Sequence, residues 1–187
     1  MNNNGPRQFR ISVTELAEFC CRRGDLNLGL ERTPSAQDGQ RGQRSVQANR
    51  PPAYQREISV NATFGDNVFQ CTLAGRIDGL LEQTTLPEKN SSLEQSRLLD
   101  TYPESKRDHS EPTENPAATS HTLLEEIKTT YCSAADLPPA QKAVHWAQLQ
   151  LYGALYLQQH SDDTLTLQLT YFKLDDESQF DFQETAS

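Results

Sequence analysis

Glu126 and Lys128 stand two residues apart in the segment LLEEIKTTYC. The apolar residues around them, together with Thr129 and Thr130, predict a buried strand. Side chains at positions i and i+2 of a strand point to the same face, so a carboxylate and an ammonium group would lie side by side. An ion pair on a solvated surface has the same pattern, and the pair alone leaves both interpretations open.

A second acidic residue, Asp78, lies in the strand-like segment LAGRIDGLLE. Two carboxylates and a lysine that converge from neighbouring strands would form an oxygen-rich pocket suited to Mg²⁺. Gly75 and Gly79 flank the aspartate. Such glycines allow the chain to bend and a ligand to approach closely, although a β-bulge would explain them equally well.

The segment AQKAVHWAQLQLYGALYLQQH has apolar residues at helical spacing, which predicts a long helix. Gln148 and Tyr152 are four residues apart and so share one face of it. They would face the acidic pocket or simply pack between helix and sheet. His145 is more typical of a hydrogen-bonded structural histidine than of a ligand, and Trp146 of a core or interface residue.

Two helices are predicted before the strands. Ser12 and Glu15 have the spacing of a capping box ahead of a short amphipathic helix. Thr33 followed by Pro34 predicts the start of a second helix, which would continue to about Gln47.

Strands follow from about Tyr54, where the apolar residues begin to alternate. REISVNATF and VFQCTLAGRIDGLLE are separated by a turn at Gly65, and TLTLQLTYFKL forms a last strand after the long helix. The order is therefore helix, helix, two or three antiparallel strands, helix, strand. This order predicts one mixed α/β domain over residues 1–187, with helices around a central sheet.

Residues 83–119 differ from the rest because they are rich in Ser, Glu, Pro, Asn and Thr and have no sustained period. This composition predicts a disordered insertion, which is tolerated because loop-closure entropy grows slowly with length. Without the insertion, the strands of Asp78 and Glu126 would be close in sequence. We therefore expect them to pair as a hairpin.

Composition limits the function classes. The chain has 187 residues and a net charge of −9, yet its lysine-free start is rich in arginine. Arg22, Arg23, Arg41 and Arg44 are candidates for phosphate contacts, or simply part of a solvated face.

Other features favour a reducing cytosol. No apolar run approaches the roughly 20 residues needed to span a bilayer, and the first residues lack a signal-peptide core. The four cysteines have no C-x-x-C spacing, so we expect free, mostly buried thiols and neither a disulfide framework nor a zinc site.

Taken together, GRIDG, EIK and QLQLY resemble the motifs of the PD-(D/E)XK nuclease superfamily, in the branch that contains RecB-type exonucleases and CRISPR adaptation nucleases. The segment SVTELAEFCCRRGDL and the arginine-rich helix look closer still to a nuclease domain associated with bacterial DinG/XPD-type helicases. The resemblance spans most of the chain outside residues 83–119.

The resemblance implies a restriction-endonuclease-like core and a nuclease that uses Mg²⁺ or Mn²⁺. Asp78, Glu126 and the Ile127 carbonyl would hold the metal, and Lys128, Gln148 and Tyr152 would complete the catalytic set. It also implies DNA as the substrate, as single strands or ends, and a fused or partner helicase in the bacterial cytoplasm. The chain would then be part of a longer protein.

The chain departs from the family pattern at two positions and in its cysteines. Ile77 precedes Asp78 where the family name has proline, and Gln43 stands where many members carry a metal-binding histidine or glutamate. The cysteines do not follow the layout of the iron–sulfur relatives, so no cluster is expected. A catalytically silent, nuclease-like module that binds DNA or docks a partner is therefore the alternative hypothesis.

Overall fold

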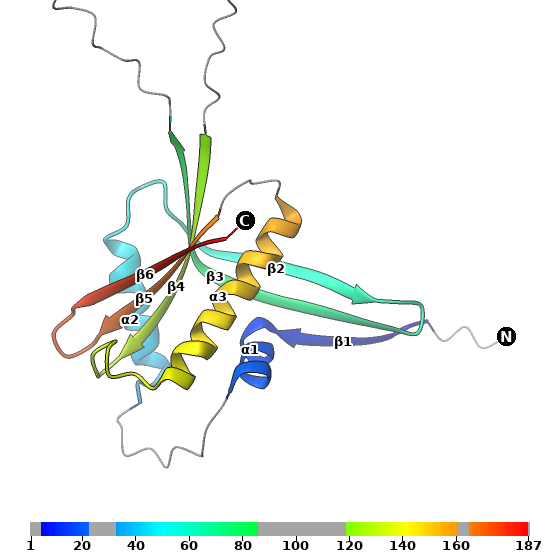
Figure 1. Ribbon diagram of the computed structural model, residues 1–187, viewed down its shortest axis with the longest axis horizontal. Coiled ribbons are helices and arrows are strands. Elements are labelled where there is room, and N and C mark those ends of the chain that lie inside the picture. Colours follow the sequence, from blue (N-terminus) through cyan, green and yellow to red (C-terminus); the bar gives the residue numbers. More distant parts are fainter. Residues whose placement is uncertain (1–4, 23–32, 86–118, 161–164, 187) are drawn as a thin grey trace, which may run out of the picture.

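The computed structural model describes residues 5–22, 33–85, 119–160 and 165–186 (Figure 1). Its elements follow in the order β1 (Arg7–Ser12), α1 (Val13–Cys21), α2 (Ala36–Ala48), β2 (Gln55–Gly65), β3 (Phe69–Thr85), β4 (Thr119–Thr130), α3 (Pro139–Gln159), β5 (Leu165–Lys173) and β6 (Gln179–Ala186).

The six strands form one mixed sheet in the order β1-β3-β4-β5-β6, with β2 also paired to β3. β1 is parallel to β3, and β4 is parallel to β5, while the other pairs are antiparallel. A mixed α/β fold with a central sheet flanked by helices is thus confirmed. The expected hairpin pairing of the Asp78 and Glu126 strands is confirmed as well, since β3 pairs antiparallel with β4.

The long strand β3 holds two groups of partners. β2 occupies one edge of it over residues 70–80. β1 and β4 share the other edge in succession, at residues 69–74 and 79–85 of β3. Residues 75–78 lie between these two partners. There β3 passes from a projecting arm, which it forms with β1 and β2, into the body of the sheet (Figure 1).

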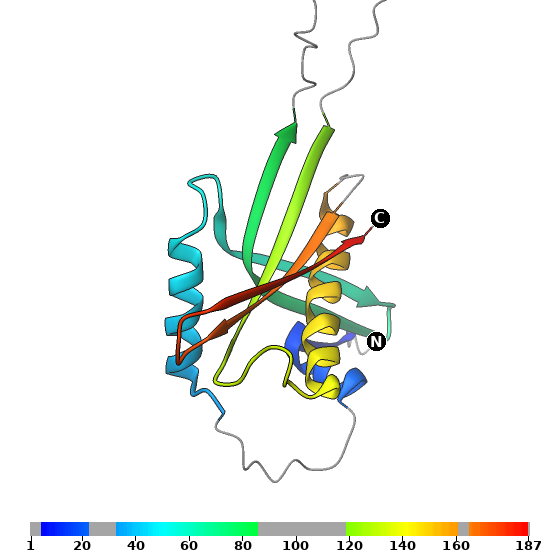
Figure 2. The same ribbon diagram turned by 60° about the vertical axis from the view of Figure 1, so that its left-hand side comes forward.

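The helices cover both faces of the sheet. α1 and α3 contact each other on one face, and α2 lies on the opposite face against β4 and β5 (Figures 1 and 2). The main core lies under α3 and includes Ile77, Leu149 and Leu169. A smaller cluster lies under α2 and contains Val46, Ile127 and Phe172. Alternate residues of β4 therefore face different helices, as strand geometry requires.

Helix starts follow local capping chemistry. The predicted capping box of Ser12 and Glu15 is confirmed. The prediction that α2 begins at Thr33–Pro34 is wrong, because Ser35 is the N-cap two residues later and forms a complete capping box with Asp38. Gly42 within α2 permits a close approach, since a Cβ there would lie 2.5 Å from the Thr129 hydroxyl.

Two strands were not predicted, β1 before the first helix and β6 in the acidic C-terminal segment. β1 is short and mostly exposed, and β6 carries alternating polar residues on an edge, so neither has a strong hydrophobic pattern. The predicted insertion 83–119 overlaps strand at both ends, at 83–85 and 119; its remainder lies outside the described residues.

The four cysteines are free, as expected, but Cys20 is exposed and the other three are half-buried, so the prediction of buried thiols is wrong. Among the described helices, none combines the length and apolarity needed to cross a bilayer.

Candidate metal centre

The predicted acidic residues meet where β3 and β4 diverge. The ladder between the two strands ends at the pair Gly79 and Glu125. Immediately beyond it, the Asp78 Oδ2 atom accepts a hydrogen bond of 2.8 Å from the backbone N–H of Ile127. Asp78 is thereby attached to the backbone of the residue that follows Glu126.

Glu126 and Lys128 share one face of β4, as the strand period predicts, and they form an ion pair. Lys128 Nζ lies 2.8 Å from Glu126 Oε1. Gln148 joins the two from α3, because its Oε1 accepts from Lys128 at 2.8 Å and its Nε2 donates to Glu126 Oε1 at 2.7 Å. The other carboxylate oxygen, Glu126 Oε2, is buried and has no hydrogen-bond partner among the described residues.

Tyr152 lies next to this group on α3, one turn after Gln148. Its hydroxyl lies 3.4 Å from Gln148 Nε2 and makes a hydrogen bond with the backbone of Arg76, in the stretch of β3 between its β1 and β4 partners. A Cβ at Gly75 would lie 2.5 Å from the Tyr152 ring, so this glycine makes room for the tyrosine. Gly79 serves Tyr54 in the same way, since a Cβ there would overlap the Tyr54 hydroxyl. The two flanking glycines thus accommodate aromatic side chains.

Gln43 reaches the opposite side of Asp78 from α2. Its Nε2 donates to Asp78 Oδ1 at 2.7 Å and to Glu57 Oε1 at 2.6 Å. Gln47, one turn later, donates to the Asp78 backbone carbonyl at 2.8 Å. Both oxygens of the Asp78 side chain are therefore hydrogen-bonded.

Glu57 is a third acidic residue of the site that the sequence reasoning missed. The register of β2 and β3 places it opposite Asp78, because Arg56 pairs with Gly79 and Ile58 with Ile77. Its φ of 60° is in the left-handed region, which is uncommon for glutamate and strains the strand. Antiparallel pairing of REISV with GRIDG would have placed the two acids together, but the exact register was not predicted.

Burial sets the charge balance of the site. Burial, reinforced by the charge of Glu126 and more weakly of Glu57, raises the pKa of Asp78 to about 8. Burial also raises the pKa of Glu126, and the charge and hydrogen bond of Lys128 offset this only in part. For Lys128 burial alone would lower the pKa, but Glu126 and Asp78 raise it overall. Lys128 is therefore held in its charged form, beside two acids whose ionised forms are disfavoured.

The donor set fits a hard divalent cation. The described ranges contain no group of three or more His, Cys, Asp and Glu side chains arranged to hold a metal ion. Mg²⁺, however, commonly uses one or two carboxylates and retains several waters. The buried, unpartnered Glu126 Oε2 is an oxygen that such an ion could satisfy.

The candidate arginines lie elsewhere. Arg22 is the C-cap of α1. Arg41 pairs with Glu177 at 3.5 Å, and Arg44 donates a hydrogen bond to Gln40. Both arginines line a pocket along α2 that does not include the acidic site. Arg23 lies outside the described residues.

His145 is structural, as expected. Its Nδ1 lies 2.9 Å from the Tyr171 hydroxyl, and burial together with the nearby Lys128 charge lowers the His145 pKa to about 3. Trp146 packs half-buried against the main core.

Comparison with known proteins gave no family assignment. No protein-family model matches the chain, and no curated protein matches it either. A solved structure described as "Crystal structure of SSO0001" aligns over 94% of this chain and 67% of that one, with 16% identity and a TM-score of 0.47.

Proposed function

We propose that this chain is a divalent-metal-dependent DNA nuclease that hydrolyses phosphodiester bonds in single strands or at ends. The observation that carries the proposal is the buried Glu126 Oε2, which has no partner among the described residues while a lysine and Asp78 stand beside it. Leaving a buried carboxylate oxygen unsatisfied costs about 1–3 kcal/mol or more, and a bound cation would remove that cost.

Mg²⁺ or Mn²⁺ would be held by Asp78, Glu126 and the Ile127 carbonyl, with water as the remaining ligands. When bound, such an ion polarises the scissile phosphate, acidifies a water molecule and offsets charge on the leaving oxygen. It would also favour the ionised forms of Asp78 and Glu126, whose pKa values are raised chiefly by burial and less by neighbouring acidic charge.

The protein's own groups would orient the reaction. Lys128 carries a proton and sits 2.8 Å from both Glu126 Oε1 and Gln148 Oε1, so its ammonium is fixed in direction. From there it would orient the attacking water and stabilise charge on the phosphate. Gln148 and Tyr152 are positioning residues that hold the lysine and the carboxylate from α3.

DNA, and a fused or partner helicase in the bacterial cytoplasm, complete the proposal. These partners follow from the motif resemblance. The contacts within the acidic site support the phosphodiester chemistry.

The test is cleavage of end-labelled single-stranded DNA with Mg²⁺, Mn²⁺ or EDTA. We expect cleavage with either ion, and its loss in Asp78→Ala and Lys128→Ala proteins whose circular dichroism spectra are unchanged. Asp175→Ala, an exposed turn carboxylate, is the matched control. Mn²⁺ should raise the Tm of the wild type but not of Asp78→Ala, because a ligand that binds only the folded state stabilises it. Cleavage that survives both substitutions would remove the proposed site.

The alternative function is a catalytically silent module that binds DNA or docks a partner. Gln43 favours it, because this neutral side chain occupies Asp78 Oδ1 while the Ile127 N–H occupies Oδ2. This alternative predicts salt-sensitive DNA binding, no cleavage with any divalent ion, and no change in Tm on adding Mn²⁺.

A further inference from the structure

One face of the projecting arm continues from the acidic site as a polar surface. On β2 and β3, the facing pair Glu57 and Asp78 is followed two residues further by Ser59, which pairs with Arg76. Because strand residues two apart share a face, the same face continues outward into the arm. Arg10 of β1 extends it, since it pairs with Thr72 of β3.

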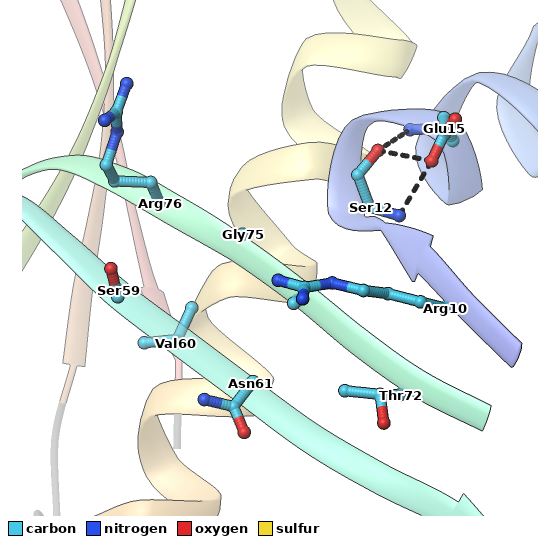
Figure 3. Close-up of a pocket in the computed structure, with 10 residues that line it drawn as sticks. Arg10, Ser12, Glu15, Ser59, Val60, Asn61, Thr72, Gly75 and Arg76 are labelled. Atoms are coloured by element: carbon cyan, nitrogen blue, oxygen red, sulfur yellow. Dashed lines mark hydrogen bonds between the residues drawn. The ribbon is translucent and has the colours of Figure 1, made fainter. Parts of the chain in front are cut away.

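This face is hollowed into a groove of about 830 Å³ bounded by α1 (Figure 3). The lining has few large apolar side chains and consists of Arg10, Ser12, Glu15, Ser59, Val60, Asn61, Thr72, Ala74, Gly75 and Arg76. The volume lies within the range of pockets for small ligands, about 300–1,000 Å³. It can accept a few units of one extended polymer strand.

The lining of the groove contains two arginines and one glutamate. Arg76 uses its Nε for an ion pair with Glu57, and its side chain is 67% exposed. Arg10 is exposed, and its side chain makes no hydrogen bond or ion pair with any residue in the described ranges. The one acidic side chain in the lining, Glu15, is bonded to the N–H and hydroxyl of Ser12 in the capping box of α1.

Spacing along β3 suits a backbone-following contact. Thr72, opposite Arg10, is four residues from Arg76, which corresponds to about 13 Å along the strand. Arg76 is also two residues from Asp78, so a strand held by both arginines would arrive at the acidic site. Basic grooves of this kind follow a nucleic-acid backbone without reading its sequence.

We propose that this groove binds the sugar–phosphate backbone of one nucleic-acid strand and leads it to Asp78, with Arg10 and Arg76 contacting successive stretches of phosphate. The inference rests on the proposed function for its direction, toward the acidic site. It assigns strand binding to the arm and not to the arginines of α2.

Binding without cleavage tests the groove directly. Fluorescence anisotropy of a labelled oligothymidylate, in EDTA, would be compared for wild type, Arg10→Ala and Arg76→Ala. Each substitution should weaken binding about tenfold and reduce the salt dependence of log K by about 0.7, the value for one single-strand phosphate contact. Arg7→Ala is the matched control, because Arg7 is exposed on the same strand but its side chain belongs to the opposite face.

The outcomes separate the groove from the nuclease activity. The Asp78→Asn protein should bind the strand at least as well as the wild type. If the strand binds but no protein cleaves it, the proposed nuclease activity is contradicted and the proposed binding by the groove is supported. Equal losses in Arg7→Ala and Arg10→Ala, or a loss confined to an Arg41→Ala/Arg44→Ala protein, would overturn the groove. A parallel measurement with labelled oligouridylate identifies the polymer. Tighter binding of the DNA strand supports the proposal, and exclusive binding of RNA contradicts the link between the groove and a DNA nuclease.

Discussion

Glu125 and Glu126 are neighbours on β4, are both buried, and have opposite surroundings. Glu125 faces α2 and accepts hydrogen bonds from Arg50, Tyr54, Gln168 and Thr170. Although burial alone would raise its pKa, these bonds, led by that of Arg50, hold the pKa of Glu125 below its ordinary value. Glu126 faces α3, shares a single oxygen with its partners, and has a raised pKa.

The difference teaches how one strand separates structural from chemical roles. A carboxylate whose acceptor sites are all filled contributes to the fold and has no capacity left for a ligand. A carboxylate with a free buried oxygen is a cost to the fold that a ligand can remove. Matched glutamine substitutions at the two positions should therefore act on different properties of the protein.

The largest effect is expected for Glu126→Gln on DNA cleavage. Loss of a metal-binding oxygen should lower the cleavage rate about 10³-fold or more, corresponding to ~4 kcal/mol in the barrier. The free energy of unfolding should change by less than about 1 kcal/mol, since glutamine retains an oxygen for Lys128 and Gln148. Lys128 also keeps Asp78 as a counter-ion, because removing the Glu126 charge favours the ionised form of Asp78. Single-turnover rates and urea titrations measure the two quantities. Undiminished cleavage would show that Glu126 takes no part in the reaction.

The second effect is expected for Glu125→Gln on stability. Arg50 would lose its buried counter-ion, and the new amide would face groups that donate hydrogen bonds. We expect a loss of about 3 kcal/mol in unfolding free energy, because breaking the buried ion pair leaves Arg50 with only Asp181, 3.7 Å away, as a counter-ion. Urea unfolding against Glu126→Gln as the matched control measures it. Equal urea midpoints for the two variants would contradict the assignment of a structural role to Glu125 and a chemical role to Glu126.

The smallest effect is expected for Asp78→Asn and depends on pH. The pKa of Asp78 is raised from 3.8 to about 8, so between these values the folded protein retains a proton that the unfolded chain has lost. Stability contributed by this group is therefore complete below about pH 4 and is lost as the pH rises toward 8. In metal-free buffer the variant should gain ~1–3 kcal/mol relative to wild type between pH 5 and pH 9.

Thermal unfolding of both proteins across that range measures this shift. A difference in Tm that stays constant with pH would mean that Asp78 is ionised throughout. It would also remove the electrostatic strain that we assign to the metal-free site.

Local patterns in the sequence were enough to predict much of the site. Period two placed Glu126 and Lys128 on one face, and helical spacing placed Gln148 and Tyr152 on another, because both rules act within a few residues. The mixed sheet followed from the order of such segments. The start of α2 was misplaced because Ser35 competes with Thr33 as a cap, and local preference alone does not decide between them.

Long-range geometry supplied the rest. Glu57 becomes part of the site only through its register with Asp78 and a left-handed backbone angle. The Arg50–Glu125 pair joins residues 75 positions apart, which no local period encodes. The lack of a hydrogen-bond partner at Glu126 Oε2 is likewise a property of packing, since no donor from the described residues lies against this oxygen.

The ladder between β3 and β4 runs outward from the site to the pair Thr85 and Thr119, so the hairpin is already closed at its outer end by hydrogen bonds. The separation of Asp78 and Glu126 is thus fixed before the chain leaves the sheet. Whatever sequence joins Thr85 to Thr119 is therefore free to change in length and composition. This end of the hairpin is a natural insertion point, where evolution or an engineer can graft a turn, a binding segment or a whole domain without rebuilding the acidic site.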